Sequence, residues 1–195
     1  VKPWGSKMFK DGKEIKHLRG RGPFWWSQVA RYESPNSLLP LYNSIREIQE
    51  KQLNQVIIEE PVIHKLPNGM FRLLQGEYLQ KDVLRNWILV EFDHGSLDCN
   101  SLSLDKRLTS TLAGLPSAFH QCEMVVLLSN KAFMEGYPNH MSLHIYFRLS
   151  KPMLNSQIKR ALTGLEGVDI SVFSNGRRHY VSPPLLDNTK REIIG

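Results

Sequence analysis

The sequence has little cysteine and no long apolar stretch. Cys99 and Cys122 are its only cysteines and form no Cys-x-x-Cys pair, so they provide either one disulfide or two ordinary thiols. No run of 18 apolar residues is present, and the N-terminus is polar and basic without a signal-like apolar segment. Internal repeats and low-complexity tracts are absent as well. We therefore expect a cytoplasmic protein that needs no membrane.

What is present indicates a globular domain. With 195 residues and 41% hydrophobic side chains, the chain can bury one core or two tightly joined subdomains. Helices and strands alternate without strict βαβ regularity, which predicts an α/β or α+β fold. Apolar spacing predicts helices at 38–53, 78–85 and 104–115, and strands at 55–58, 70–74, 87–92 and 124–128. We expect residues 1–195 to be a single domain excised from a longer protein.

The charge of the chain favours an anionic partner. Its formal net charge is +6 and its isoelectric point is near 9.4, which places nucleic acid and nucleotides first among possible ligands. Basic and aromatic side chains occur together near the N-terminus, at Lys16, Arg19, Arg21, Trp25 and Trp26. Such a mixture suits single-stranded nucleic acid, because cations meet phosphates and rings stack on bases. The alternative is that the tryptophans belong to a core strand and the basic residues to a solvated loop.

Two acids end the apolar run 87–93. Side chains alternate along a strand, so Glu91 and Asp93 share a face, with Cα atoms about 6.5 to 7 Å apart. That spacing lets both carboxylates reach one hard divalent cation, or bracket two cations about 3.5 to 4 Å apart. His94 and Gly95 follow, which places the acids where the strand gives way to a loop. The alternative is an edge strand whose acids face water.

A second strand with polar residues on one face is predicted at 139–149. Ser142, His144, Tyr146 and Arg148 alternate with apolar residues, so one face belongs to the core and the other forms a polar platform. A histidine between a hydroxyl group and a Tyr/Arg pair can hold phosphate oxygens. A lone histidine on a strand is, however, often structural.

A third acid interrupts the apolar run 167–173. Asp169 needs a polar partner, a metal ion or water to be tolerated among apolar neighbours. A Ser-Asn-Gly turn follows and leads to Arg177, Arg178 and His179. Arginine and histidine near a metal-binding acid suit a triphosphate or a primer backbone. The alternative for the arginines is the exposed tip of a hairpin.

The order of these motifs resembles the archaeo-eukaryotic primase superfamily. Its three signatures are similar to Glu91-Phe92-Asp93, to Ser142-Leu143-His144 about 50 residues later, and to Val168-Asp169 about 25 residues beyond that. The likeness covers roughly residues 85–185 and extends to primase-polymerase domains of plasmids and phages. Many members have Asp where this chain has Glu91. Glutamate is still an oxygen ligand, but its extra methylene displaces the carboxylate and affects metal preference or activity.

The resemblance implies a fold, a reaction and partners. The fold would be an RRM-like catalytic sheet at about 86–195, packed with an N-terminal α/β part at about 1–85. Glu91, Asp93 and Asp169 would hold two Mg²⁺ or Mn²⁺ ions for template-directed nucleotidyl transfer with nucleoside triphosphates as substrates. Nucleotide binding would fall to Ser142, His144, Arg148, Arg177, Arg178 and His179. Single-stranded DNA would be the template, and a replicative helicase a natural partner.

Two other classes of function remain open. One is a non-catalytic single-strand binder on an RRM-like sheet, which would leave the three acids without a role. The other is a metal-dependent nuclease or rolling-circle initiator, which also uses acids and histidine. Against this second class, the chain has no His-apolar-His pair with a tyrosine nucleophile beside it.

Overall fold

The computed structural model describes the following residues: 7–10, 13–17, 25–26, 37–50, 57–58, 63–65, 67, 71–73, 84–93, 103–128, 143–174, 178–179, 181 and 185–186. The helices are α1 (Leu39–Glu50), α2 (Leu104–Ala113), α3 (Asn155–Leu162) and the 3₁₀ helices η3 (Ser117–Phe119) and η4 (Ile170–Phe173). The strands of the main sheet are β7 (Arg85–Phe92), β8 (Met124–Leu128) and β9 (Leu143–Met153). The described residues therefore form an α+β fold.

Short strands make three smaller sheets. They are β1 (Lys7–Lys10), β2 (Lys13–His17), β3 (Trp25–Trp26), β4 (Ile57–Ile58), β5 (Ile63–Lys65), β6 (Phe71–Leu73), β10 (Arg178–His179) and β11 (Leu185–Leu186). Their orders are β11-β1-β2, β10-β4 and β3-β6-β5. Thus β10 brings a segment near the end of the chain beside β4.

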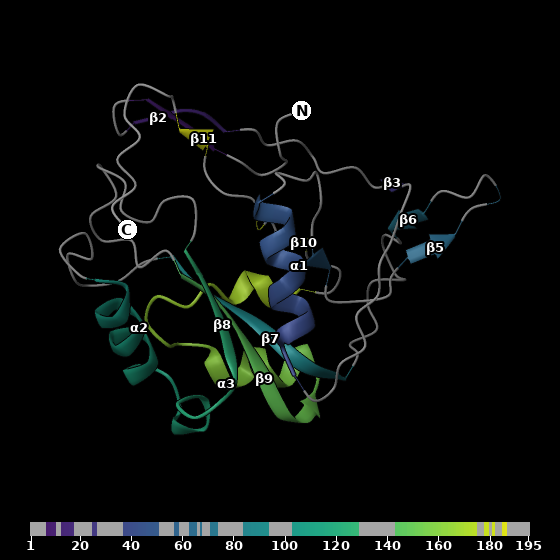
Figure 1. Cartoon of the computed structure of the whole chain (residues 1–195). Helices are drawn as coiled ribbons and strands as arrows, with labels where there is room; N and C mark the ends of the chain where they lie inside the picture. The colour runs from purple at the N-terminus through teal and green to yellow at the C-terminus, as the bar shows by residue number, and fades with distance from the viewer. Residues whose placement is uncertain are drawn as a thin grey trace.

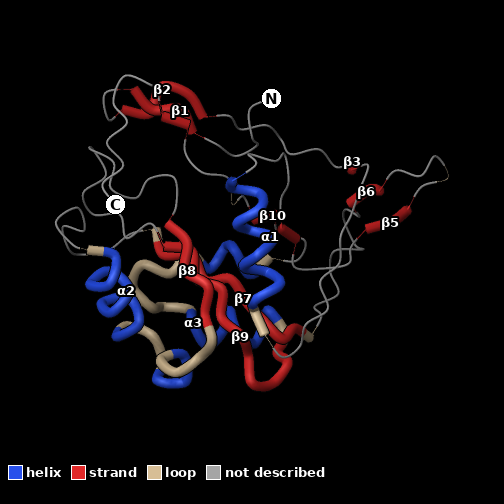
Figure 2. Tube along the Cα trace, viewed as in Figure 1, coloured by secondary structure: helices blue, strands red, loops and turns tan. Residues whose placement is uncertain are grey.

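The main sheet is antiparallel, in the order β7-β9-β8. Figure 2 shows its three strands side by side, and Figure 1 shows α1 on the opposite side of the sheet from α3. Alternating apolar residues along β7 and β9 favour this arrangement, because each strand buries side chains on both faces. After α3, an isolated bridge between Val168 and Phe92 places one further residue beside β7.

One face of the sheet packs under α2 and α3. Ile88, Val90 and Phe92 from β7 enter this core together with Ile145 and Phe147 from β9. The helices and η4 complete it with Leu108, Leu112, Ile158, Leu162, Val172 and Phe173. The fully buried aliphatic side chains each contribute about 1.5 to 3 kcal/mol relative to an exposed position.

The other face packs under α1. Ile45 and Ile48 of this helix meet Leu89, Val125 and Tyr146 of the sheet. The prediction of a polar platform on this face of β9 was therefore wrong at Tyr146, which is fully buried. The reason is that α1 covers part of the face, which a strand pattern alone does not reveal.

Helix ends follow local chemistry. Ser103 precedes α2, and its hydroxyl oxygen accepts from Lys106 N at 3.4 Å. The predicted helix at 104–115 is confirmed, and it ends before Pro116. Helix α3 was not predicted from the sequence, although Gly164, just after the helix with φ +89°, is a usual signal for a helix end.

The chain just before the main sheet is not the predicted helix where the structure describes it. Arg85 belongs to β7 and not to a helix, while the rest of the expected helix at 78–85 lies outside the described residues apart from Leu84.

The structure also bears on the cysteine and membrane expectations. Cys122 is a free thiol, so it forms no disulfide with Cys99 and that alternative is wrong. No helix in the part of the chain described is long and apolar enough to cross a membrane.

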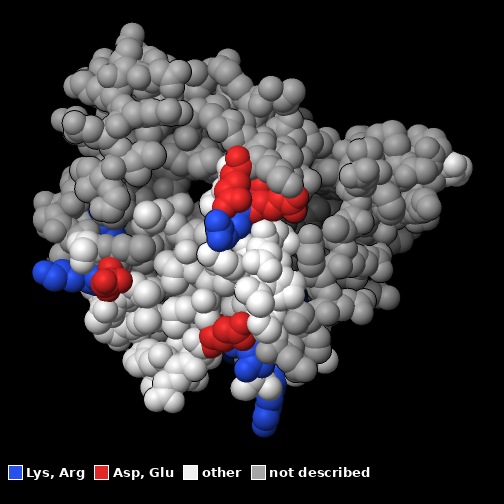
Figure 3. Space-filling view, in the orientation of Figure 1, with Lys and Arg blue, Asp and Glu red and all other residues white. Residues whose placement is uncertain are grey.

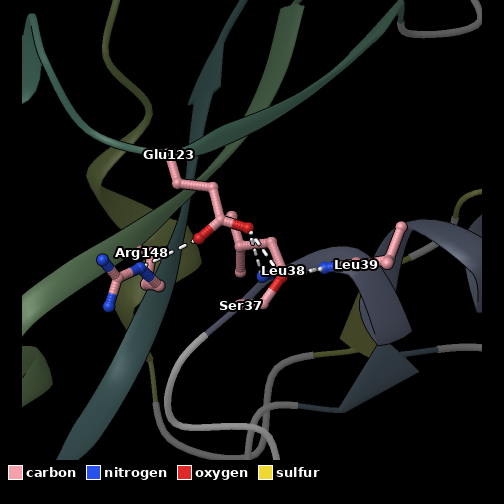
Figure 4. A network of polar contacts seen from close by, with 5 residues as sticks. All are labelled: Ser37, Leu38, Leu39, Glu123 and Arg148. Carbon is pink, nitrogen blue, oxygen red and sulfur yellow. Dashed lines mark hydrogen bonds and ion pairs between the residues drawn. The ribbon is translucent and has the colours of Figure 1, made fainter.

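The Glu123 carboxylate bonds to the start of α1 and to Arg148 of the sheet. Glu123, just before β8, accepts through Oε1 from Leu38 N at 2.6 Å and from Ser37 Oγ at 3.0 Å. Its Oε2 lies 2.9 Å from Arg148 Nε, an ion pair drawn with the other contacts in Figure 4. The Leu38 N–H is the main cause that lowers the pKa of Glu123, and Ser37 and Arg148 lower it further. An ionised Glu123 thus offsets the positive end of α1.

We expect Glu123→Gln to lower the free energy of unfolding by about 0.3 to 1 kcal/mol at neutral pH, because the charge at the helix start is lost while the amide oxygen still accepts, and the side chain is 37% exposed to screening solvent. Glu123 has a lowered folded pKa, so its stabilisation is complete above the usual value of 4.5 and disappears as pH falls through the folded pKa. Urea unfolding at several pH values measures this difference. Glu166→Gln, at an exposed turn, is the charge-matched control, and equal stability of wild type and Glu123→Gln at neutral pH would contradict the prediction.

Candidate functional site

Glu91 and His144 face each other across the sheet. They are register partners on β7 and β9, and directly opposite residues of an antiparallel pair point to the same face. His144 Nε2 lies 3.8 Å from Glu91 Oε1, which is too long for a hydrogen bond, and the two groups form an ion pair only when His144 is protonated. Both side chains are mostly buried, at 18% and 17% exposure. The Glu91-Phe92-Asp93 motif and the Ser142-Leu143-His144 motif therefore lie side by side through Glu91 and His144.

The Val168-Asp169 motif lies along the edge of β7 opposite the one that pairs with β9. Asp169 N donates to Glu91 O at 2.9 Å, and Asp93 N donates to Gly167 O at 3.2 Å. These two bonds flank the bridge between Phe92 and Val168. Asp169 is thus the cross-strand neighbour of Glu91, opposite the side on which His144 lies. The backbones of all three motifs come together at the end of β7.

The Asp169 carboxylate has a local partner. Its Oδ1 accepts from Ser171 N at 2.8 Å, and its Oδ2 accepts from Ser171 Oγ at 2.9 Å. Asp169 is therefore the N-cap of η4, and Ser171 is the polar partner that an acid among apolar neighbours was expected to need. Each carboxylate oxygen keeps a second lone-pair direction, so a capping carboxylate can still bind a cation.

The donors at this end of β7 suit a hard cation. Glu91, Asp93 and Asp169 supply carboxylate oxygens, which Mg²⁺ and Mn²⁺ prefer, and all three side chains are partly exposed. Within the described residues, no three His, Cys, Asp or Glu side chains are arranged to hold a metal ion. Convergence of the three carboxylates on bound ions stays a prediction.

His144 favours its neutral form. Burial is the main cause that lowers the pKa of His144; the carboxylates of Glu91 and Asp93 raise it in part, and His179 lowers it. A neutral imidazole has one N–H donor and one acceptor nitrogen. His144 can therefore offer one hydrogen bond to an anionic ligand without carrying a charge itself.

The neighbours of His144 on its strand face are packed or paired. The Tyr146 ring lies 5.8 Å from the Trp87 ring and 6.4 Å from the His179 ring, measured between centroids. Arg148 pairs with Glu123 at the start of α1. Arg148 thus has a structural partner that the sequence did not reveal, and its role in nucleotide binding stays a prediction.

The remaining candidates are placed as follows. His179 in β10 is buried, with 2% exposure, so its side chain lies beneath the surface and not on it. Arg178 shares β10, while Ser142 and Arg177 lie outside the described residues. Lys16 is in β2, Trp25 and Trp26 form β3, and Arg19 and Arg21 lie outside the described residues. The nucleic-acid contacts therefore stay predictions.

The surface view adds one constraint on nucleic-acid binding. In Figure 3, the acidic and basic side chains drawn in colour lie in small mixed groups with uncharged surface between them. Over the coloured and white part of that face, no continuous basic surface is present. The net charge of +6 is therefore not gathered there.

Three residues with structural partners, Gln49, Glu123 and Ser171, were not predicted from the sequence. Ser171 had a local signal, since Asp-x-Ser is a capping pattern. Gln49 and Glu123 had none, because their partners lie 132 and 85 residues away in the sequence. Comparisons with protein-family models, with curated proteins and with solved structures find no match for this chain. Its function is therefore inferred from the residues and their geometry.

Proposed function

We propose that this chain is a template-directed nucleotidyltransferase that makes primers, as a primase-polymerase domain of a plasmid, phage or other mobile element. The observation that carries the proposal is the meeting of three separate motifs at the end of β7. Glu91 is the cross-strand neighbour of His144 on one side and of Asp169 on the other. Asp93 follows on the same strand face as Glu91.

The order of elements supports an RRM-like sheet for this part of the chain. Along the sequence it runs β7, α2, β8, β9, α3 and then Val168, and across the sheet it runs Val168, β7, β9, β8. A βαββαβ unit with both helices on one face has this arrangement. Here α2 and α3 share one core with the sheet, while the acids and His144 belong to the other face.

In the proposed reaction, the acids bind metal ions and His144 binds the triphosphate. Glu91, Asp93 and Asp169 would hold two Mg²⁺ or Mn²⁺ ions, which when bound lower the pKa of the primer 3′-hydroxyl and offset triphosphate charge. His144 would donate its N–H to a triphosphate oxygen and so orient the α-phosphate. A bond forms between the 3′-oxygen and that phosphorus, the bond to pyrophosphate breaks, and the hydroxyl proton goes to solvent.

The partners follow from the same proposal. Single-stranded DNA would serve as the template, with Lys16, Arg19, Arg21, Trp25 and Trp26 as candidate contacts. A replicative helicase, fused or separate, would supply unwound template.

Primer synthesis is tested directly with labelled nucleotides, a single-stranded template and Mn²⁺ or Mg²⁺. Template-dependent extension, with none when the metal ion is chelated, supports the proposal. Retention of the template without extension or cleavage would instead indicate a single-strand binding domain, and metal-dependent cleavage would indicate a nuclease or initiator. Each of these results contradicts nucleotidyl transfer.

A further inference from the structure

Helix α1 holds the segment that carries His179 in place. Near its C-terminal end, Gln49 Nε2 donates to Val181 O at 2.9 Å, across 132 residues of sequence. The bond is partly buried, and Val181 itself is 3% exposed in the core between α1 and the sheet. A helix of the N-terminal half is thereby tied to the segment that follows β10.

The segment that contains His179 and Val181 packs against β9, the strand that carries His144. His179 is buried and meets Tyr146 edge-on, with ring centroids 6.4 Å apart and an interplanar angle of 80°. Tyr146 is two residues from His144 on the same face of β9, because side chains alternate along a strand. Displacement of His179 would therefore disturb the packing beside His144.

Apolar packing alone does not determine the register of so short a segment. β10 pairs with β4 over two residues, Arg178 with Ile58 and His179 with Ile57. A directed hydrogen bond specifies one position along the chain, whereas apolar burial is non-directional. Gln49 supplies such a bond by donating to the carbonyl oxygen of Val181, which is two residues after His179.

We propose that Gln49 is a positioning residue for the nucleotide site, because its bond to Val181 O holds the buried His179 against Tyr146 beside His144. The inference rests on the proposed function, since it takes a nucleoside triphosphate as the ligand of His144. Gln49 does not itself contact the triphosphate. It acts through the His179 segment.

Gln49→Met tests this, because methionine has a similar length and no N–H donor. The expected result is a rise in the dissociation constant for a labelled deoxynucleoside triphosphate with Mn²⁺ of up to about 10-fold. One ordinary hydrogen bond sets this limit, because its loss can shift the position of the His179 segment by no more than its own free energy. In primer extension, the nucleotide KM should rise more than kcat falls. The NMR signals of labelled His179 and His144 rings should shift. Gln49→Glu, which places an anion against the carbonyl oxygen, should weaken binding further.

Ser37→Ala is the control, since it removes a hydrogen bond from the other end of the same helix. It should lower the melting temperature without changing nucleotide affinity or the His179 signal. If wild type binds the triphosphate and Gln49→Met binds it equally, the positioning role is overturned while the proposed function stands. If wild type binds no triphosphate, both are overturned.

Discussion

Asp93→Ala should abolish primer synthesis and leave the fold intact. Asp93 supplies a hard oxygen donor on the strand face of Glu91, and its backbone pairs with Gly167, two residues before Asp169. Its loss therefore removes a ligand for the ions that the proposed reaction needs. The fold should persist because the main-chain bond from Asp93 N to Gly167 O does not depend on the side chain. Extension of a labelled primer measures the first effect, and circular dichroism with a melting curve measures the second.

The matched control is Asp105→Ala, which removes the same charge from the exposed first turn of α2. Its synthesis should equal that of wild type. Full activity of Asp93→Ala would end the enzyme hypothesis. Loss of the cooperative melting transition would instead assign Asp93 a structural role.

His144→Ala should weaken nucleotide binding by roughly 10- to 150-fold. A hydrogen bond from the imidazole to a charged triphosphate oxygen contributes about 1.5 to 3 kcal/mol, which corresponds to that range of affinity. Metal binding should change little, because His144 contacts the ligand and not the ions in this proposal. Titration of a nucleoside triphosphate in the presence of Mn²⁺ gives the affinity, and a melting curve gives the stability.

His120→Ala is the control for this substitution. The His120 ring contacts Leu115 O at 3.0 Å in the turn after η3, and His120 is an exposed residue that belongs to neither β7 nor β9. The His120→Ala variant should bind nucleotide with the same affinity as wild type. Equal nucleotide affinities for wild type and His144→Ala, together with a lower melting temperature for the variant, would show that His144 only packs against Glu91 and its neighbours.

Much of the main sheet was predictable from short-range pattern. Alternation along 87–92 and 143–149 correctly assigned Ile88, Val90 and Phe92 to one face and Trp87 and Leu89 to the other. The spacing at 104–115 and the Pro116 stop predicted α2. These predictions succeed because strand alternation and helix ends are governed by neighbouring residues.

Within the candidate site, the residue types were predictable but their partners were not. The sequence indicated Glu91, Asp93, His144 and Asp169 as carriers of chemistry from their polarity among apolar residues. It did not indicate that Asp169 caps η4 or that Arg148 pairs with Glu123. Those partners depend on which segments the fold brings together.

The sequence by itself determined the period of the strands, the extent of α2 and the presence of three acidic or histidine motifs in a given order. Only the tertiary structure decided that Glu91 lies between His144 and Asp169, that α1 covers Tyr146, and that Gln49 reaches Val181. The physical reason is that strand register and helix packing join residues far apart in the chain. Side-chain periodicity reports the face on which a residue lies, but not which distant residue it meets there.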